Sequence, residues 1–275
     1  MDKKNYVFDI EVFPNYFCGT FMNVLDNSEY SSFVIAWKLG IDQSLEMKDF
    51  LDNNVSSMIG YNNLYYDYPI LEFIYNYSGK DINKDAFNLS KKIIGSDRGE
   101  NFGHRKNYLW KQVDLMKMMA FDKLGVSLKQ CAINLKWKKI QDLPLPYDHN
   151  VTENELEIIL KYNINDVLIT LELYNALHEE INLRKELSEL YQVNLFSASD
   201  SKIANILLEK FYTEESGESI TKLRGLRSPR EFLWLKDCLC KSISFKTKKL
   251  RDLKLELANT LVVRENNFAY KKTIH

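Results

Sequence analysis

Residues 6–13 alternate between the two faces of a strand, and this pattern constrains the fold more than any other feature of the chain. One face would hold Tyr6, Phe8, Ile10 and Val12, and the other would hold Val7, Asp9, Glu11 and Phe13. Two carboxylates thus share one face of a strand that is otherwise apolar. Because burial of like charges is unfavourable without a compensating cation, the pattern indicates either a cation site on a central strand or a strand with one solvated face.

Further strands are expected directly after this segment. The stretches 16–27 and 30–39 are rich in β-forming residues and are separated by the turn-like Asp26, Asn27 and Ser28. Three consecutive strands with short connections predict an antiparallel meander.

The chain after Gly40 alternates between strand and helix patterns. We expect a short helix over 43–53, a strand over 55–61, a helix opened by Pro69, a helix and then a hairpin or loop over 79–108, a strand over 113–119, a helix capped by Ser127, and a long helix over 152–180. Thr152 and Glu155 predict a capping box for the long helix. Its apolar side would hold Leu156, Ile159, Leu160 and Asn163. Such an order of elements predicts an α/β fold in which helices flank a mixed sheet.

Charge is distributed unevenly along the chain. The sequence has 37 Lys and Arg against 38 Asp and Glu; residues 196–275 have 16 against 10, which leaves 21 against 28 in residues 1–195. We therefore expect an acidic domain over 1–195 and a basic, wholly helical extension over 196–275, with helix patterns at 228–239 and 247–261. The extension would contact phosphates, and a solvated helix face is the alternative.

Composition also excludes some classes of protein. No apolar run approaches the roughly 18–20 residues that span a bilayer, and the N-terminus lacks the apolar core of a signal peptide. We expect no membrane partner and a cytoplasmic protein. Cys238 and Cys240 lack a second cysteine or histidine pair that would complete a zinc site, so buried or half-buried thiols are expected.

Two later segments place acidic residues at structurally defined positions. Asp67 follows Asn62 by five residues, between an apolar strand and the helix opened by Pro69, and an ordinary helix-terminal aspartate is the alternative. Tyr162 and Asp166 are four residues apart and therefore neighbours on one helix face. An aspartate in the middle of an apolar helix is unfavourable; a metal site or a structural salt bridge would explain it.

The order of these elements resembles the three exonuclease motifs of the DEDD superfamily, namely D-x-E at residues 9–11, N-x-x-x-x-D at 62–67 and Y-x-x-x-D at 162–166. The chain is most similar to the proofreading 3′→5′ exonuclease domains of phage DNA polymerases, and the resemblance includes residues 125–146. It implies a ribonuclease-H-like fold. Tyr162, with Lys161 rather than histidine before it, is similar to the tyrosine type of the superfamily.

The resemblance implies catalysis by two divalent ions, Mg²⁺ or Mn²⁺, held by oxygen ligands. Asp9 would bridge both ions, Glu11 and Asp166 would bind the ion on the nucleophile side, and Asp67 would act on the other ion through water. Tyr162 would remain a neutral phenol that orients the attacking water, because its ordinary pKa is about 10. The product would be nucleoside 5′-monophosphates from the 3′ end of DNA.

Several other residues are expected to contact the substrate. Asn62 would orient the substrate or its neighbouring strand. Within the cluster Tyr61, Tyr65, Tyr66 and Tyr68, we expect Tyr65 or Tyr66 to offer a stacking face to unpaired bases. Phe13 would wedge against the terminal bases. Core packing is the alternative for each of these aromatic side chains.

The expected partners are a single-stranded or frayed DNA 3′ end and a DNA polymerase module, in cis or in trans. A further alternative for residues 196–275 is docking onto that polymerase module. No aspartate-rich palm sequence occurs before His275, so we expect a polymerase fragment or a separately encoded exonuclease, in the host cytoplasm if a phage encodes it. An RNA-directed 3′→5′ exoribonuclease of the same superfamily is one alternative. A catalytically silent scaffold is another, although all four carboxylates and the tyrosine are present.

Overall fold

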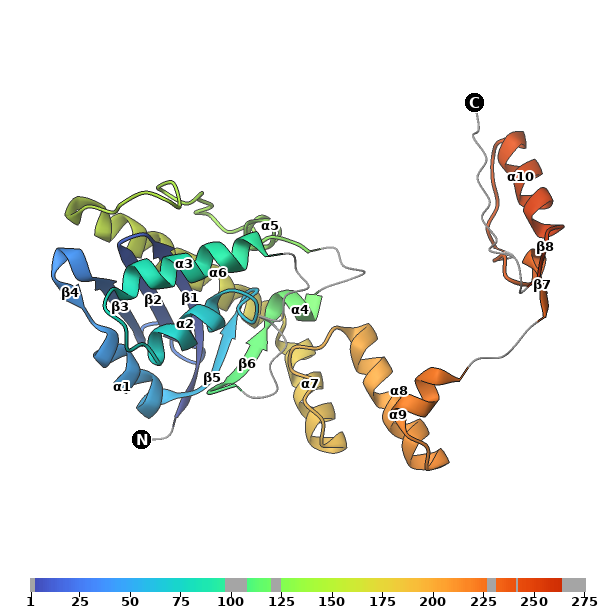
Figure 1. Ribbon diagram of the computed structural model, residues 1–275, viewed down its shortest axis with the longest axis horizontal. Coiled ribbons are helices and arrows are strands. Elements are labelled where there is room, and N and C mark those ends of the chain that lie inside the picture. Colours follow the sequence, from blue (N-terminus) through green and yellow to red (C-terminus); the bar gives the residue numbers. More distant parts are fainter. Residues whose placement is uncertain (1–2, 97–107, 120–124, 227–230, 241, 264–275) are drawn as a thin grey trace. The chain divides into compact units, whose positions relative to one another are not determined.

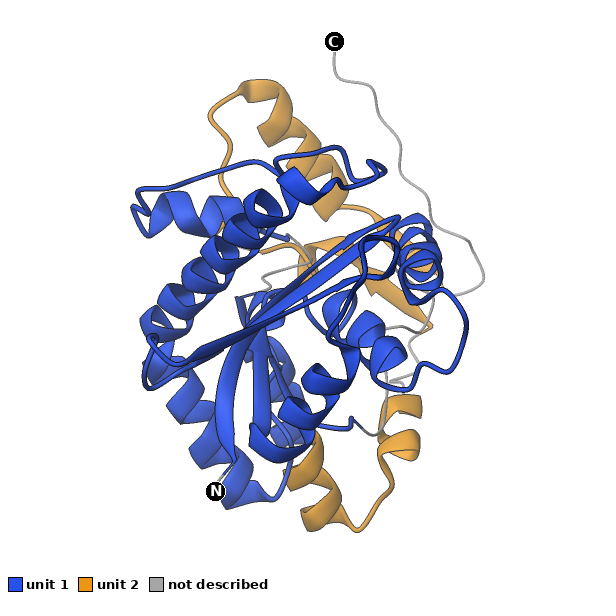
Figure 2. Ribbon diagram, turned by 90° about the vertical axis from the view of Figure 1, so that its left-hand side faces the viewer, with its two compact units in different colours: residues 1–208 blue, residues 209–275 orange. Residues whose placement is uncertain are grey.

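The computed structural model describes residues 3–96, 108–119, 125–226, 231–240 and 242–263. The chain divides into two compact units, Met1–Leu208 and Glu209–His275 (Figure 2). Among the described helices, none is both long and apolar enough to cross a bilayer.

A six-stranded sheet forms the centre of the first unit (Figure 1). Its strands are β1 (Lys4–Phe13), β2 (Tyr16–Asn23), β3 (Tyr30–Ala36), β4 (Ile41–Asp42), β5 (Val55–Gly60) and β6 (Lys111–Asp114). They lie in the order β4-β3-β2-β1-β5-β6. β1 to β4 form an antiparallel meander, whereas β5 is parallel to β1 and β6 is parallel to β5. The predicted meander and mixed α/β sheet are confirmed, and the strand order is compatible with a ribonuclease-H-like fold.

Helices cover both faces of this sheet. The helices on one face are α1 (Ser44–Asn54), α2 (Asp67–Tyr75) and α3 (Ile82–Gly95), and those on the other are α4 (Leu115–Met119), α5 (Leu128–Asn134) and α6 (Leu156–Ala176). The wholly apolar face of β1 packs in one buried cluster with α1, α2 and α3. Val7, from the opposite face of β1, belongs to a second cluster with α4, α5 and α6. The face of β1 that bears Asp9 and Glu11 is therefore the one that α6 covers.

The expected elements after Gly40 need three corrections. Pro69 does not open its helix, because α2 begins two residues earlier, at Asp67. The strand predicted over 113–119 ends at Asp114, because the carboxylate of Asp114 accepts hydrogen bonds from the backbone nitrogens of Met116 (3.1 Å) and Lys117 (3.3 Å) and so begins α4. The single helix predicted over 152–180 is broken at Leu177, after which α7 (His178–Tyr191) begins.

The other calls in this part of the chain are confirmed where they can be compared. Ser127 caps α5 through its hydroxyl, which accepts from the backbone nitrogen of Gln130. Thr152 and Glu155 form the predicted capping box, in a 3-10 turn over Glu153–Glu155 that leads into α6. The strand expected over 30–39 ends at Ala36, because a second 3-10 turn covers Trp37–Leu39. Cys238 and Cys240, expected to be buried or half-buried, are exposed. The hairpin or loop expected after α3 falls largely in 97–107, outside the described residues.

The C-terminal part of the chain is not wholly helical, which corrects the sequence-based expectation. It contains α8 (Asp200–Ser216), α9 (Ile220–Gly225), a 3-10 turn at Leu235–Asp237 and α10 (Lys248–Ala258), but also the antiparallel strands β7 (Phe232–Trp234) and β8 (Leu261–Val263). The helix predicted over 228–239 is therefore wrong for residues 232–234, and the one predicted over 247–261 ends at Ala258. Phe, Trp and Val favour strands, and each of these short strands gives the other its hydrogen-bonding partner.

Candidate metal centre

β1 places two carboxylates on the face of the sheet that α6 covers. Asp9 and Glu11 alternate with the buried apolar residues of β1 and are themselves half-buried. Directly opposite them on β2 lie Thr20 and Cys18, which are fully buried. The neighbouring strand on this side therefore brings no formal charge to the two carboxylates.

α6 supplies a third carboxylate from the middle of its length. Asp166 approaches Asp9 and Glu11 so closely that one oxygen atom of each residue lies within 4.8 Å of the other two. Tyr162 lies one helical turn earlier on the same face, and burial followed by the charge of Asp166 raises the pKa of its hydroxyl. The structure thus brings together four residues of the sequence motifs, although 157 positions of the chain separate Asp9 from Asp166.

The surroundings of these three carboxylates raise their pKa values. Burial is the largest cause, and repulsion between the groups adds to it, so that the pKa values of Asp9 and Glu11 lie well above the ordinary range. The pKa of Asp166 rises to about 6, again mainly through burial. Within the described ranges, no Lys, Arg or His forms an ion pair with any of the three.

Asp67 is the first residue of α2 and lies just after the turn that follows β5. Its side chain is only 5% exposed, and burial raises its pKa to about 7, with a further contribution from the charge of Asp114. Asp67 in turn raises the pKa values of Asp9 and Glu11, so its charge acts on theirs. Asp67 lies outside the group of three that approach within 4.8 Å among the described residues.

Asp114 is a buried carboxylate beside the site that the sequence analysis did not single out. It is fully buried at the end of β6, and burial raises its pKa. Besides starting α4, it accepts hydrogen bonds from the backbone nitrogens of Asn62 (3.0 Å) and Leu64 (3.4 Å). Asp114 therefore fixes the turn that precedes Asp67. A single aspartate in the largely apolar segment 113–119 is the sequence signal that could have identified it.

Asn163 is a second residue whose role the sequence analysis missed. It was assigned to the apolar side of the long helix, and it is indeed fully buried there. Its side-chain nitrogen, however, donates a hydrogen bond to Oδ2 of Asp9 at 2.8 Å. The signal in the sequence was an amide on an apolar helix face beside Tyr162 and Asp166.

Asn62 begins the turn between β5 and α2. Its backbone is left-handed, with φ of 62°, a conformation that asparagine tolerates better than most residues. Its carbonyl accepts hydrogen bonds from the backbone nitrogens of Tyr65 (3.1 Å) and Tyr66 (3.3 Å). Hydrogen bonds within the turn that bears these tyrosines, and one from the backbone of Asn62 to the carboxylate of Asp114, thus fix its conformation.

The aromatic side chains near the site differ in exposure. Tyr66 is half-buried, its hydroxyl hydrogen-bonds to Ser90 (2.8 Å), and burial followed by the charges of the site carboxylates raises its pKa. The ammonium group of Lys117 lies 4.3 Å from the ring centre of Tyr65. Phe13 is only 1% exposed and packs in the core. A base could stack on Phe13 only if this ring left the core.

The two remaining tyrosines of the cluster have structural contacts. The hydroxyl of Tyr61 donates to the backbone oxygen of Val126. Tyr68 is fully buried, and its hydroxyl donates to Oε1 of Glu72 at 3.0 Å. Core packing therefore accounts for Tyr68, and a tie to the segment before α5 accounts for Tyr61.

The donors of this site fit a divalent cation. Asp9, Glu11 and Asp166 offer only oxygen atoms, which Mg²⁺ and Mn²⁺ prefer. Carboxylates that raise one another's pKa values are stabilised in their ionised form by a nearby cation. Within the described residues, no cationic side chain forms an ion pair with them. The three residues can therefore hold a metal ion.

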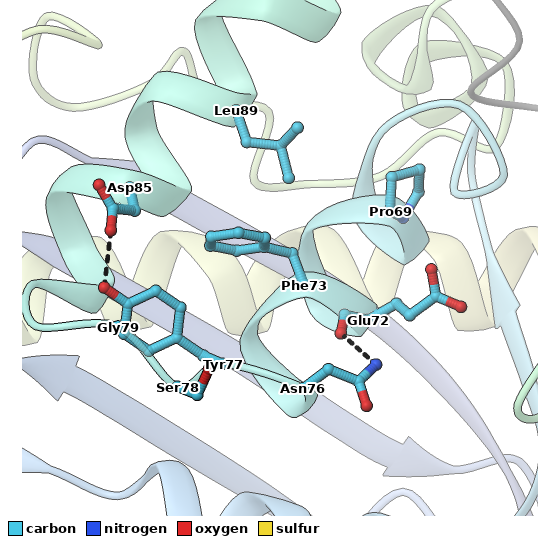
Figure 3. A pocket seen from close by; sticks show the side chains of 9 residues that line it. All are labelled: Pro69, Glu72, Phe73, Asn76, Tyr77, Ser78, Gly79, Asp85 and Leu89. Carbon is cyan, nitrogen blue, oxygen red and sulfur yellow. Dashed lines mark hydrogen bonds between the residues drawn. The ribbon is translucent and has the colours of Figure 1, made fainter.

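A separate hollow of about 620 Å³ lies between α2 and α3 (Figure 3). Phe73, Pro69 and Leu89 give it an apolar side, and the hydroxyl of Tyr77 donates to Asp85 at 2.7 Å. The residues that line it include none of the three clustered carboxylates, so it is distinct from the candidate metal centre.

No family model and no curated protein matches this chain. Among solved structures, Phi29 DNA polymerase complexed with primer-template DNA is 14% identical, with a TM-score of 0.41, over 69% of this chain and 35% of the polymerase. The family B DNA polymerase from the hyperthermophilic archaeon Pyrobaculum calidifontis is 17% identical, with a TM-score of 0.47, over 74% of this chain and 28% of the polymerase. The chain thus spans about a third of the length of these polymerases.

Proposed function

We propose that this chain is a metal-dependent 3′→5′ exonuclease that removes nucleotides from the 3′ end of DNA and works beside a DNA polymerase module. The observation that supports this most strongly is the approach of Asp9, Glu11 and Asp166 to within 4.8 Å of one another, with Tyr162 one helical turn before Asp166. These four residues, together with Asp67, are those of the DEDD motifs of the tyrosine type.

In this proposal Asp9, Glu11 and Asp166 hold the metal, and the charge of Asp67 acts on the same site. Divalent ions bound there supply the positive charge that displacement at phosphorus requires. Tyr162 keeps its proton at neutral pH, because burial and then the charges of Asp166 and Glu11 raise its pKa. Tyr162 lies one turn before Asp166 on the same face of α6, and its neutral hydroxyl can donate one hydrogen bond and accept another, so that it can orient the attacking water.

The direct test is degradation of 5′-labelled oligonucleotides, single-stranded or with a mispaired 3′ end, in Mn²⁺ and in EDTA. We expect a ladder that shortens from the 3′ end, nucleoside 5′-monophosphates as products, and no reaction in EDTA. A matched RNA strand serves as the comparison. If only the RNA strand is digested, the substrate is RNA and not DNA. If neither strand is cleaved, the proposed nuclease function is contradicted.

A further inference from the structure

The most informative unassigned side chain is that of Asn163, which lies beside the candidate metal centre. It is fully buried on α6, one turn from Ile159 on one side and from Val167 on the other, and both of these residues are fully buried too. Its Nδ2 donates a hydrogen bond to Oδ2 of Asp9 at 2.8 Å. A polar amide on an apolar helix face therefore contacts a carboxylate of the site.

The oxygen atom of the same amide is left without a partner. Oδ1 of Asn163 is buried and accepts no hydrogen bond from any residue that the structure describes. A buried amide oxygen in this state destabilises a fold, and leucine, whose side chain has the same number of heavy atoms and the same branching, would avoid the cost. Fold stability alone therefore does not explain an asparagine here, whereas its contact with Asp9 does.

The two ends of the amide are not interchangeable toward a carboxylate. The NH₂ group can only donate, and the carbonyl oxygen and an ionised carboxylate can only accept. Only the orientation that presents Nδ2 to Asp9 avoids a repulsive contact. This hydrogen bond, made from α6, restrains Oδ2 of Asp9 and hence the plane of its carboxylate relative to Glu11 and Asp166.

We propose that Asn163 is a positioning residue that orients the carboxylate of Asp9 for metal binding. The inference rests on the metal-dependent function proposed above. Hydrogen-bonding partners of metal ligands typically change metal affinity by about 10–100-fold when they are removed. Because the contact does not involve DNA, its effect appears in metal binding without substrate.

The test is a calorimetric titration of the full chain with Mn²⁺ alone. For Asn163→Leu we expect the Kd for Mn²⁺ to rise by about 10-fold or more, while thermal unfolding in EDTA at pH 5 stays cooperative. Asn163→Ala, which cannot overpack the core, is expected to show the same loss of Mn²⁺ affinity. It replaces the leucine variant in the test if that variant does not fold.

Asn83→Leu is the matched control, because Asn83 is also a buried helical asparagine in the first unit. Its amide donates to the backbone oxygen of Ile35 (2.7 Å) and accepts from the backbone nitrogen of Trp37 (3.0 Å). We expect this variant to be less stable but to retain the wild-type Kd for Mn²⁺. An equal loss of affinity in Asn83→Leu would show that destabilisation alone causes it, and would overturn the positioning role.

Two results separate this inference from the function on which it rests. A wild-type Kd in both Asn163 variants would overturn the positioning role and leave the proposed metal site intact. A wild-type chain that binds no Mn²⁺ would overturn the proposed function, and the inference with it.

Discussion

The carboxylate of Asp114 accepts a hydrogen bond from the backbone nitrogen of Asn62 at 3.0 Å, although 52 positions separate the two residues. The same side chain accepts from Leu64, Met116 and Lys117. One buried carboxylate thus holds the turn before Asp67 and begins α4.

Replacement of Asp114 by alanine is expected to lower the free energy of unfolding by about 3 kcal/mol. The variant loses a helix cap and leaves buried backbone donors without a partner, and each of these effects costs about 1–3 kcal/mol. Urea denaturation followed by circular dichroism measures the change. Asp148→Ala, at an exposed position, should lie within about 0.5 kcal/mol of wild type; equal effects of the two substitutions would contradict the role of Asp114.

Replacement of Asp9 by alanine is expected to reduce nuclease activity by more than about 100-fold, because even an outer partner of a metal ligand changes affinity or activity by about 10–100-fold. The fold should be retained, since the variant removes one member of a group of mutually repelling carboxylates. The measurement is the initial rate of cleavage in Mn²⁺, with a thermal melt as the check on folding. Wild-type rates from a folded variant would remove Asp9 from the site.

Tyr162→Phe is expected to lower the cleavage rate by roughly 100-fold, the lower limit for a positioned proton-handling group, and to leave the Kd for Mn²⁺ unchanged. The half-buried ring is kept, and only the hydroxyl one turn before Asp166 is lost. Tyr174→Phe, farther along α6 and also half-buried, provides the control and should keep the wild-type rate. Unchanged turnover in Tyr162→Phe would exclude the phenol from the mechanism.

Without metal, the free energy of unfolding is expected to fall as the pH rises from about 4 to 7. The folded-state pKa values of Asp67 (about 7) and Asp166 (about 6) lie above the ordinary value of 3.8. The folded protein therefore binds more protons than the unfolded chain in this window, which gives stability a negative slope with pH. Thermal melts in EDTA should show it, and Mn²⁺ should raise the Tm more at pH 7 than at pH 5.

Asp67→Asn tests the origin of this pH dependence. The variant lacks one of the buried ionisable groups, so in EDTA its stability should fall less steeply between pH 4 and 7 than that of wild type. If the two proteins have the same slope, folding does not raise the pKa of Asp67.

The basic residues of the second unit are expected to contact the DNA backbone. Replacement of Lys246 and Lys248, both exposed, by glutamine should weaken DNA binding and reduce the slope of log affinity against log salt concentration by about 2, one for each lost phosphate contact. Fluorescence anisotropy at several salt concentrations measures this slope. The same changes at Lys38 and Lys80 in the first unit serve as the control. If both double variants have the same slope of log affinity against log salt concentration, the second unit has no specific role in DNA binding.

Sequence patterns correctly predicted the elements that depend on residues near one another in the chain. The alternation in β1 gave the correct two faces, because one face is apolar throughout and must be buried. The caps at Ser127 and Thr152 were predictable because capping depends on residues that are near in sequence. The spacing of the motifs also indicated which side chains to compare, and Asp9, Glu11 and Asp166 lie close together.

The missed features depend on contacts between distant residues. The change from β6 to α4 is caused by the side chain of Asp114, which a pattern of apolar residues does not reveal. Strands β7 and β8 exist because each pairs with a segment more than 25 residues away, as the partners Trp234 and Leu261 show. Asn163 resembled an ordinary member of a helix face until its contact with Asp9 was known.

The same separation along the chain has a consequence for how the protein is made. The strand that holds Asp9 and Glu11 leaves the ribosome before Asn163 and Asp166, which follow more than 150 residues later. A nascent chain that ends before α6 has two of the three clustered carboxylates and no amide to orient them. A metal ion bound at the proposed site would then stabilise the docking of α6 onto β1, by mass action on the folded form. In this scheme the ion acts after the sheet has formed and does not nucleate it.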